Sequence, residues 1–160
     1  MSEHPDLESR SAPGDHDALR LWLRLLTCST LIEAEIRTRL RNEFDTTLPR
    51  FDLMAQLHRA PRGMKMGDLS RHMMVTNGNV TGITDQLEKE ALVRRMKDES
   101  DRRSSRIMLT PKGKKTFARM ARAHERWILE LLSPVGADRH GMLYDSLGEL
   151  KRHLNSTRGA

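Results

Sequence analysis

The residues between positions 76 and 87 combine polar side chains that can read DNA bases with an apolar stripe that can anchor them. Val80, Ile83 and Leu87 recur three and four residues apart, which predicts a helix with one buried face. Hydroxyl and amide groups on its other face can bond to base edges or phosphates in a major groove. A weak surface helix is the alternative, since Gly82 is a poor helix former. The expected DNA-contacting residues, with Thr76 also capping the helix, are Thr76, Asn77, Gly78, Asn79, Thr81, Thr84 and Gln86.

A basic segment follows this helix directly. Residues 93–97 and 106–109 are typical of two short strands, and the polar residues 98–105 between them predict a β-hairpin with a charged tip. Arginines at such a tip can enter the minor groove beside the helix, so we add Arg94, Arg102 and Arg103 to the expected DNA contacts. A solvated charged loop is the alternative, which the position directly after the helix disfavours.

Other helices must position these residues. A long helix is expected from Asp17, and its first half is apolar nearly all round, which predicts burial on several sides. A shorter helix should end before Pro61, and a second should run from about residue 65 to 73, giving a helix-turn-helix with the helix that follows. Thr110-Pro111 should open another helix, because threonine caps a helix and proline fits its first turn. A last helix should follow Gly136.

These elements predict a mainly α fold with a small β-hairpin wing. Residues 48–109 should form a winged helix-turn-helix DNA-binding lobe, and residues 17–47 and 110–156 a helical dimerisation region. Residues 1–16 have almost no large apolar side chains, which predicts a flexible N-terminal arm. The apolar stripes of the terminal helices are too extensive for the small lobe to cover. We therefore expect a homodimer, whose paired helices would read a pseudo-palindromic operator.

The composition narrows the classes of function. The chain has 160 residues, and 28 Lys and Arg against 22 Asp and Glu give a formal charge of +6, which suits a polyanion such as nucleic acid. No apolar run is long enough for a signal peptide or membrane span, so we expect a cytoplasmic protein without membrane contact. Phosphate-binding glycine loops, nucleophile elbows and paired acids and bases are missing, so neither an enzyme nor a cofactor is expected. The histidines lack metal-ligand spacing, and no metal site is expected.

The stretch from Val80 to Gly113 resembles the MarR family of transcriptional regulators, and the resemblance extends over about residues 18–154. It includes the wing signature Asp101-Arg102-Arg103 and the closing Leu-Thr-x-x-Gly that ends at Gly113. The resemblance implies that Asp101 stabilises the wing and that Arg103 contacts the minor groove. Gly82 and Gln86 stand where many relatives have Arg, and Ala91 replaces a usual Gly, which predicts a slightly altered turn before the wing.

The resemblance also implies a homodimer that binds double-stranded DNA and a small-molecule effector in a crevice between the dimerisation helices and the DNA-binding lobe. The segment from Met73 to Leu87 is similar to the branch that controls aromatic-acid degradation. It therefore implies a repressor of aromatic catabolism, released by an aromatic acid or its coenzyme A thioester. Apolar side chains would hold the ring and arginines the acid group. The candidate ligand-binding residues, for which core packing or solvation is the alternative, are Trp22, Arg24, Cys28, Arg37, Arg41, Phe51, Met54 and His58.

Two other functions stay open at this stage. Cys28, the single cysteine, has no intrachain partner and lies on the apolar stripe of the first helix, where it is either a peroxide sensor or a buried inert thiol. A nonspecific architectural DNA-binding protein would have the same positive charge, but its affinity would not depend on sequence.

Overall fold

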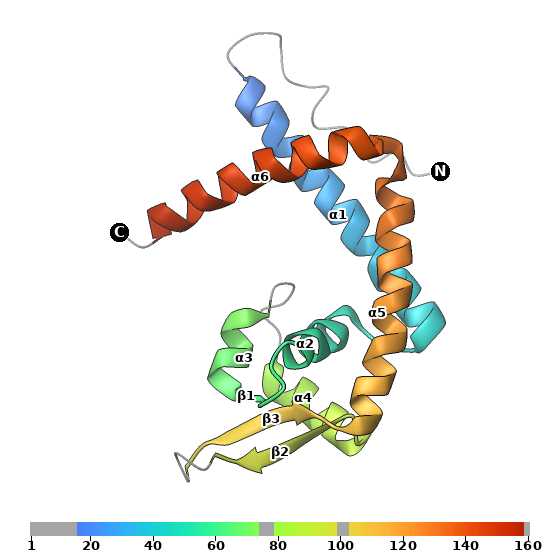
Figure 1. The fold of residues 1–160 in the computed structure, drawn as a ribbon, viewed down its shortest axis with the longest axis vertical. Coiled ribbons are helices and arrows are strands. Elements are labelled where there is room, and N and C mark those ends of the chain that lie inside the picture. Colours follow the sequence, from blue (N-terminus) through green and yellow to red (C-terminus); the bar gives the residue numbers. More distant parts are fainter. Residues whose placement is uncertain (1–15, 74–78, 99–102, 159–160) are drawn as a thin grey trace. The chain divides into compact units, whose positions relative to one another are not determined.

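The computed structural model describes residues 16–73, 79–98 and 103–158 (Figure 1). The chain divides into a larger unit that ends at Arg122 and a smaller unit that begins at Ala123. The elements of the larger unit are α1 (Asp17–Phe44), α2 (Leu48–His58), β1 (Met64–Lys65), α3 (Met66–His72), α4 (Val80–Lys89), β2 (Val93–Lys97), β3 (Ser105–Leu109) and the start of α5 (Pro111–Leu132). The predicted mainly α fold with a β-hairpin is confirmed.

Local sequence signals explain where the helices begin and end. α1 ends at Phe44, and the C-cap residue Asp45 has a left-handed backbone with φ 49°. The Thr47 hydroxyl then caps α2, accepting from the Arg50 amide at 3.4 Å. The Thr110 hydroxyl accepts from the Gly113 amide at 2.9 Å, which confirms the predicted cap of α5.

The strands form a three-stranded antiparallel sheet in the order β1-β3-β2. β2 has the predicted bounds, and its pairing with β3 runs from Val93 opposite Leu109 to Lys97 opposite Ser105. β1 was not predicted, because two residues are too few to show an alternating pattern, and Lys65 was expected to begin a helix. Through this short strand, the segment just before α3 pairs with β3 of the hairpin.

The core of the larger unit lies where α2, α3 and α4 meet the sheet. Its fully buried apolar side chains come from α1, all three of these helices and both hairpin strands: Leu40, Leu53, Met54, Leu57, Leu69, Leu87, Val93 and Ile107. The helix that could contact DNA is therefore anchored to the hairpin through shared apolar packing.

The first half of α1 differs from the expectation. Burial on several sides was predicted, yet Trp22 is 55% exposed and Leu21 is 60% exposed in the single chain. Apolar residues around a helix indicate that it needs to be covered, but they do not show that its own chain covers it. Within this chain, the apolar half of α1 is a surface.

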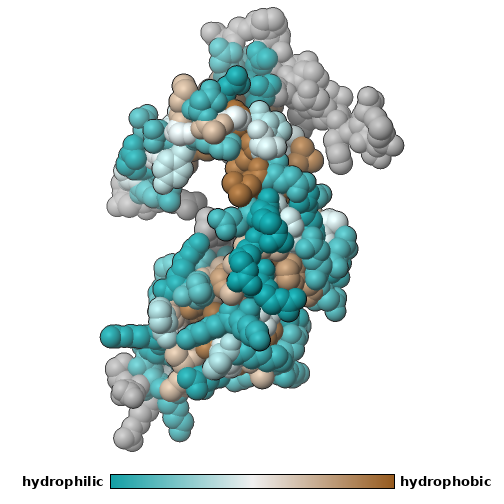
Figure 2. All heavy atoms as spheres, turned by 45° about the vertical axis from the view of Figure 1, so that its right-hand side comes forward, coloured by the Kyte–Doolittle hydropathy of each residue, from teal (hydrophilic) through white to brown (hydrophobic). Residues whose placement is uncertain are grey.

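The smaller unit consists of the end of α5, the 3₁₀ helix η2 (Ser133–Val135) and α6 (Ala137–Arg158). Gly136 makes the turn into α6 with φ 79°, and a His140 ring nitrogen lies 3.1 Å from the Leu132 carbonyl oxygen. α6 exposes the apolar side chains Met142, Leu143, Tyr144, Leu147, Leu150 and Leu154. Figure 2 shows a mostly hydrophilic face on which apolar residues form separate patches. None of the helices in the described residues is both long enough and apolar enough to cross a membrane.

Candidate nucleic-acid interface

α4 has one buried face and one polar exposed face. Val80 and Leu87 are buried, whereas Thr81 and Gln86 are exposed, as predicted. Asn79 is the N-cap, and its side-chain oxygen accepts from the Gly82 amide at 2.9 Å. The prediction that Thr76 caps this helix is therefore wrong, since the helix begins at Val80 and Asn79 supplies the cap. Asn79 is itself exposed beside Thr81.

Thr84 is a second correction. It was expected on the exposed face, but its side chain is fully buried and its hydroxyl donates to the Val80 carbonyl oxygen at 2.7 Å. Thr84 stands four residues after Val80 and three before Leu87, so helical geometry places all three on one face. The sequence prediction gave more weight to the polarity of Thr84 than to its position on the helix. Thr84 is therefore no longer a candidate for base contact.

The acidic residues of α4 are compensated by the hairpin. Arg95 of β2 forms ion pairs with Asp85 and, at 3.6 Å, with Glu88. Unpaired carboxylates there would repel DNA phosphates, so this arginine reduces a repulsion while it connects the helix to the strand. The neighbouring Arg94 is exposed on β2. Arg103, two residues before β3, is also exposed.

A buried carboxylate lies at the end of β2, where the loop of the hairpin begins. Asp98 is only 5% exposed, and its side chain lies 3.3 Å from Lys65 Nζ and 3.4 Å from Arg106 Nε. The Ser104 hydroxyl is 3.4 Å from the same carboxylate, and Arg106 also donates to the Gly63 carbonyl oxygen at 3.0 Å. Sequence analysis missed Asp98, because the partner Lys65 belongs to the unpredicted strand β1.

The turn between α4 and β2 is clamped by the start of α5. Ala91 has φ 58°, so an alanine adopts the left-handed conformation that glycine takes more easily. Leu92 then connects Ala91 to the start of β2. The Thr110 hydroxyl donates to the Ala91 carbonyl oxygen at 2.6 Å, and Lys112 Nζ donates to that of Glu90 at 2.8 Å. A Cβ on Gly113 would lie 1.9 Å from the Leu92 carbonyl oxygen, so the closing glycine of the sequence motif permits this contact.

Comparison with known proteins shows which family has this arrangement. The MarR family model matches residues 46–105, from the residue before the cap of α2 to the start of β3. A MarR family transcriptional regulator from Silicibacter pomeroyi is 33% identical, with a TM-score of 0.74 over 90% of this chain and 99% of that one. The chain belongs to the MarR family.

Two curated relatives extend the similarity. The regulator PecS of Dickeya dadantii (strain 3937) is 28% identical over 98% of this chain and 91% of its own length. The transcriptional activatory protein BadR of Rhodopseudomonas palustris (strain ATCC BAA-98 / CGA009) is 31% identical over 65% of this chain and 60% of its own length. The predicted class, a DNA-binding transcriptional regulator of the MarR type with a winged helix-turn-helix, is confirmed.

Some predicted site residues of this MarR regulator fall outside the described residues and remain predictions: the DNA contacts Thr76, Asn77, Gly78 and Arg102, and the wing-stabilising Asp101. Within the described residues, Asn79, Thr81 and Gln86 of the α4 segment and Arg94 and Arg103 of the hairpin are all exposed. The candidate interface therefore combines one polar helix face with a basic hairpin, and its contacts with DNA stay a prediction.

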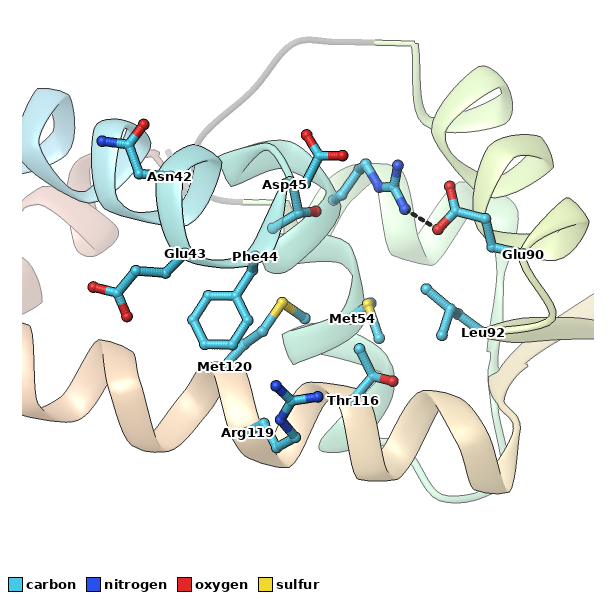
Figure 3. Close-up of a pocket in the computed structure, with 12 residues that line it drawn as sticks. Asn42, Glu43, Phe44, Asp45, Met54, Glu90, Leu92, Thr116, Arg119 and Met120 are labelled. Atoms are coloured by element: carbon cyan, nitrogen blue, oxygen red, sulfur yellow. Dashed lines mark hydrogen bonds and ion pairs between the residues drawn. The ribbon is translucent and has the colours of Figure 1, made fainter.

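The eight candidate effector residues do not line one cavity. Phe51 is buried against Phe117 with ring centroids 5.5 Å apart, and Arg37 is paired with Glu33 at 2.6 Å. Met54 lines a cavity of about 570 Å³, shown in Figure 3, whereas His58 lines a separate one of about 210 Å³. The other four candidates are exposed on α1: Trp22, Arg24, Cys28 and Arg41. Cys28 is exposed in the single chain, so the alternative of a buried inert thiol is not met there.

Proposed function

We propose that this MarR regulator binds a pseudo-palindromic operator as a homodimer, represses aromatic-compound catabolism, and is released by a small aromatic ligand. The observation that carries the operator-reading part is the exposed polar face of α4, with Thr81 and Gln86 pointing away from a fully buried anchor. Side chains with donors and acceptors on such a face discriminate between base pairs, while arginines of the wing contribute backbone and minor-groove contacts.

The apolar surfaces of the terminal helices support the homodimer. In the single chain, α1 exposes Trp22 and Leu26, and α6 exposes a row of residues that includes Leu143, Leu147 and Leu150. Exposed apolar residues spaced along a helix in this way are usually covered by another chain. A two-fold dimer would present two copies of α4 about 10 base pairs apart, which is the reason for expecting a pseudo-palindrome.

The direction of regulation and the effector follow from the family resemblance. Repression is proposed, although the relative BadR is named as an activator. Measuring transcription from the operator with and without the protein decides between repression and activation. The effector is proposed to be an aromatic acid or its coenzyme A thioester. A hundredfold release needs about 2.7 kcal/mol of coupling, which one buried ligand can supply.

The experiment compares binding to the DNA upstream of the chain's own gene with binding to a scrambled duplex at fixed salt. The variants Thr81→Val and Thr84→Val make the same change on the same helix, once on the exposed face and once in the core. Thr81→Val should weaken specific binding about five- to tenfold, because a hydrogen bond is lost. Thr84→Val should leave the affinity for DNA within about twofold, since its hydroxyl bonds inside the helix.

Each alternative has its own outcome in this experiment. Equal affinity for the two duplexes with a steep salt dependence would favour an architectural DNA-binding protein and refute the operator-specific function. Loss of affinity from Thr84→Val but not from Thr81→Val, with both variants folded, would mean that another surface reads the DNA.

A further inference from the structure

The sheet of the wing has an inner face and an outer face. Figure 1 shows α2, α3 and α4 on one side of the sheet, and all three contact its strands. Val93, Ile107 and Leu109 are buried on that inner face. Side chains alternate between the two faces along a strand, so Met96 and Met108 lie on the outer face. The outer face is therefore part of the wing but is turned away from α4.

A groove of about 570 Å³ lies on this outer face. Met96 and Met108 form its apolar part, together with Pro61 from the turn before β1. Met96 is opposite Arg106 in the strand register, so Met108 is its diagonal neighbour, within reach of a long side chain. Met96 is also 46% exposed. Methionine adapts its shape to different partners, and Met and Arg are enriched where proteins bind each other.

The groove carries an excess of positive charge. Arg62 and Lys97 line it, are exposed, and take part in no ion pair among the described residues. Asp98 is the one acidic residue among the described residues that line it. Its carboxylate lies 3.3 Å from Lys65 Nζ and 3.4 Å from Arg106 Nε, so its charge is already compensated. The remaining cations attract carboxylates to a surface that is apolar at its centre.

The apolar centre favours a protein segment over DNA as the occupant. Contacts to DNA outside the base edges are made to phosphates and sugars, which gain little from two methionine side chains. The groove also lies on the face of the sheet opposite to α4, whose polar residues are proposed to read the bases. Arg94, an expected DNA contact, is opposite Met108 in the register but does not line the groove.

We propose that the outer face of the wing sheet binds an acidic protein segment that carries apolar side chains between its carboxylates. The carboxylates pair with Arg62 and Lys97, and the apolar side chains lie against Met96 and Met108. Because α4 is on the other face, one chain can hold DNA and this partner at the same time. The surface adds recruitment of a second protein to DNA binding, whatever effector or operator the regulator recognises.

Fluorescence anisotropy with the full chain at physiological salt tests this surface. The probe is a short labelled peptide with Leu-Phe at its centre between runs of Asp and Glu, and the control peptide has Ser-Ser in place of Leu-Phe. The Leu-Phe peptide should bind about tenfold more tightly or better, because its two apolar side chains are buried against the methionines. Equal binding of the two peptides, or no binding of either, overturns the proposal.

Three variants locate the binding surface. Arg62→Gln should weaken the Leu-Phe peptide about two- to fivefold, as expected for the loss of an exposed ion pair. Met96→Thr keeps a residue suited to a strand and should remove most of the preference for Leu-Phe over Ser-Ser. Arg59→Gln removes another exposed arginine close in sequence, and it should leave the affinity unchanged because Arg59 does not line the groove. A Met96→Thr chain with the full preference, or equal effects of Arg62→Gln and Arg59→Gln, would place the peptide elsewhere and refute the assignment.

The same titration on the chain already bound to its upstream DNA tests simultaneous binding. The Leu-Phe peptide should bind this complex within about threefold of its affinity for the free chain, because salt screens the phosphates of DNA held on the other face. Displacement of the peptide by the duplex would assign the groove to the DNA interface and overturn the proposal. Failure to distinguish the upstream DNA from a scrambled duplex would instead refute the operator-specific function, while the titration of the free chain still decides the groove.

Discussion

Gly113 lies where the first turn of α5 meets the turn between α4 and β2, and replacing it with alanine should destabilise the larger unit. The added Cβ would lie 1.9 Å from the Leu92 carbonyl oxygen, well under the 3.0 Å below which one of the two groups must shift. That oxygen also accepts from the Thr110 amide at 3.1 Å, and the adjacent Ala91 carbonyl oxygen accepts from the Thr110 hydroxyl at 2.6 Å. The obstacle is therefore backbone held by hydrogen bonds.

Two opposing effects set the magnitude. Alanine is better than glycine inside a helix by about 1 kcal/mol. Forcing an extra carbon into a packed contact costs about 3 kcal/mol, at the upper end of the usual range, because no flexible side chain can give way. The steric effect should win, and Gly113→Ala should lower the free energy of unfolding by about 2 kcal/mol, or the melting temperature by about 4–8 °C.

Urea unfolding followed by circular dichroism measures this difference at one protein concentration, because association would shift the apparent stability. Gly67→Ala is the matched control, since Gly67 is also in a helix and a Cβ there meets nothing within 4 Å. The control should be unchanged or slightly more stable. If Gly113→Ala behaved like Gly67→Ala, the close approach of α5 to the Leu92 carbonyl would be refuted.

Three further predictions concern stability. Ala91→Gly should raise the free energy of unfolding by about 0.5–1 kcal/mol. Relief of the left-handed backbone strain should outweigh the cost of the added conformational entropy in the unfolded chain. A lower urea midpoint would contradict this prediction. Asp98→Asn should lower the free energy of unfolding by about 1–2 kcal/mol, since Lys65 and Arg106 lose a buried carboxylate partner but can still reach solvent. Unchanged urea unfolding would show that the charge of this carboxylate does not matter for stability. Burial lowers the pKa of His124 from 6.5, so the folded chain binds its proton less readily than the unfolded chain. Stability should therefore be full above pH 6.5 and fall as the pH drops below it, and His124→Gln should reduce that fall in pH-dependent melting.

The division of α4 into two faces shows what a periodic pattern can and cannot predict. The positions of Val80 and Leu87 were enough to place Thr84 inside, and the error there came from weighing its hydroxyl as a DNA contact. The cap of the same helix depended on where its first turn begins, and Asn79 rather than Thr76 supplies it. Boundaries within one turn are decided by competition between neighbouring capping groups, which have similar energies.

Interactions between near neighbours in the chain determined the helix order, the bounds of β2 and the Thr110 cap, because periodicity and capping act within a few residues. The tertiary structure alone decided which distant groups meet. The Arg50–Glu90 pair joins residues 40 positions apart, and the cavity beside it draws on four segments of the larger unit. Asp98 likewise depends on Lys65 from a strand too short to detect. Such contacts depend on how the helices and the sheet pack, and packing geometry is a property of the whole unit rather than of any local pattern.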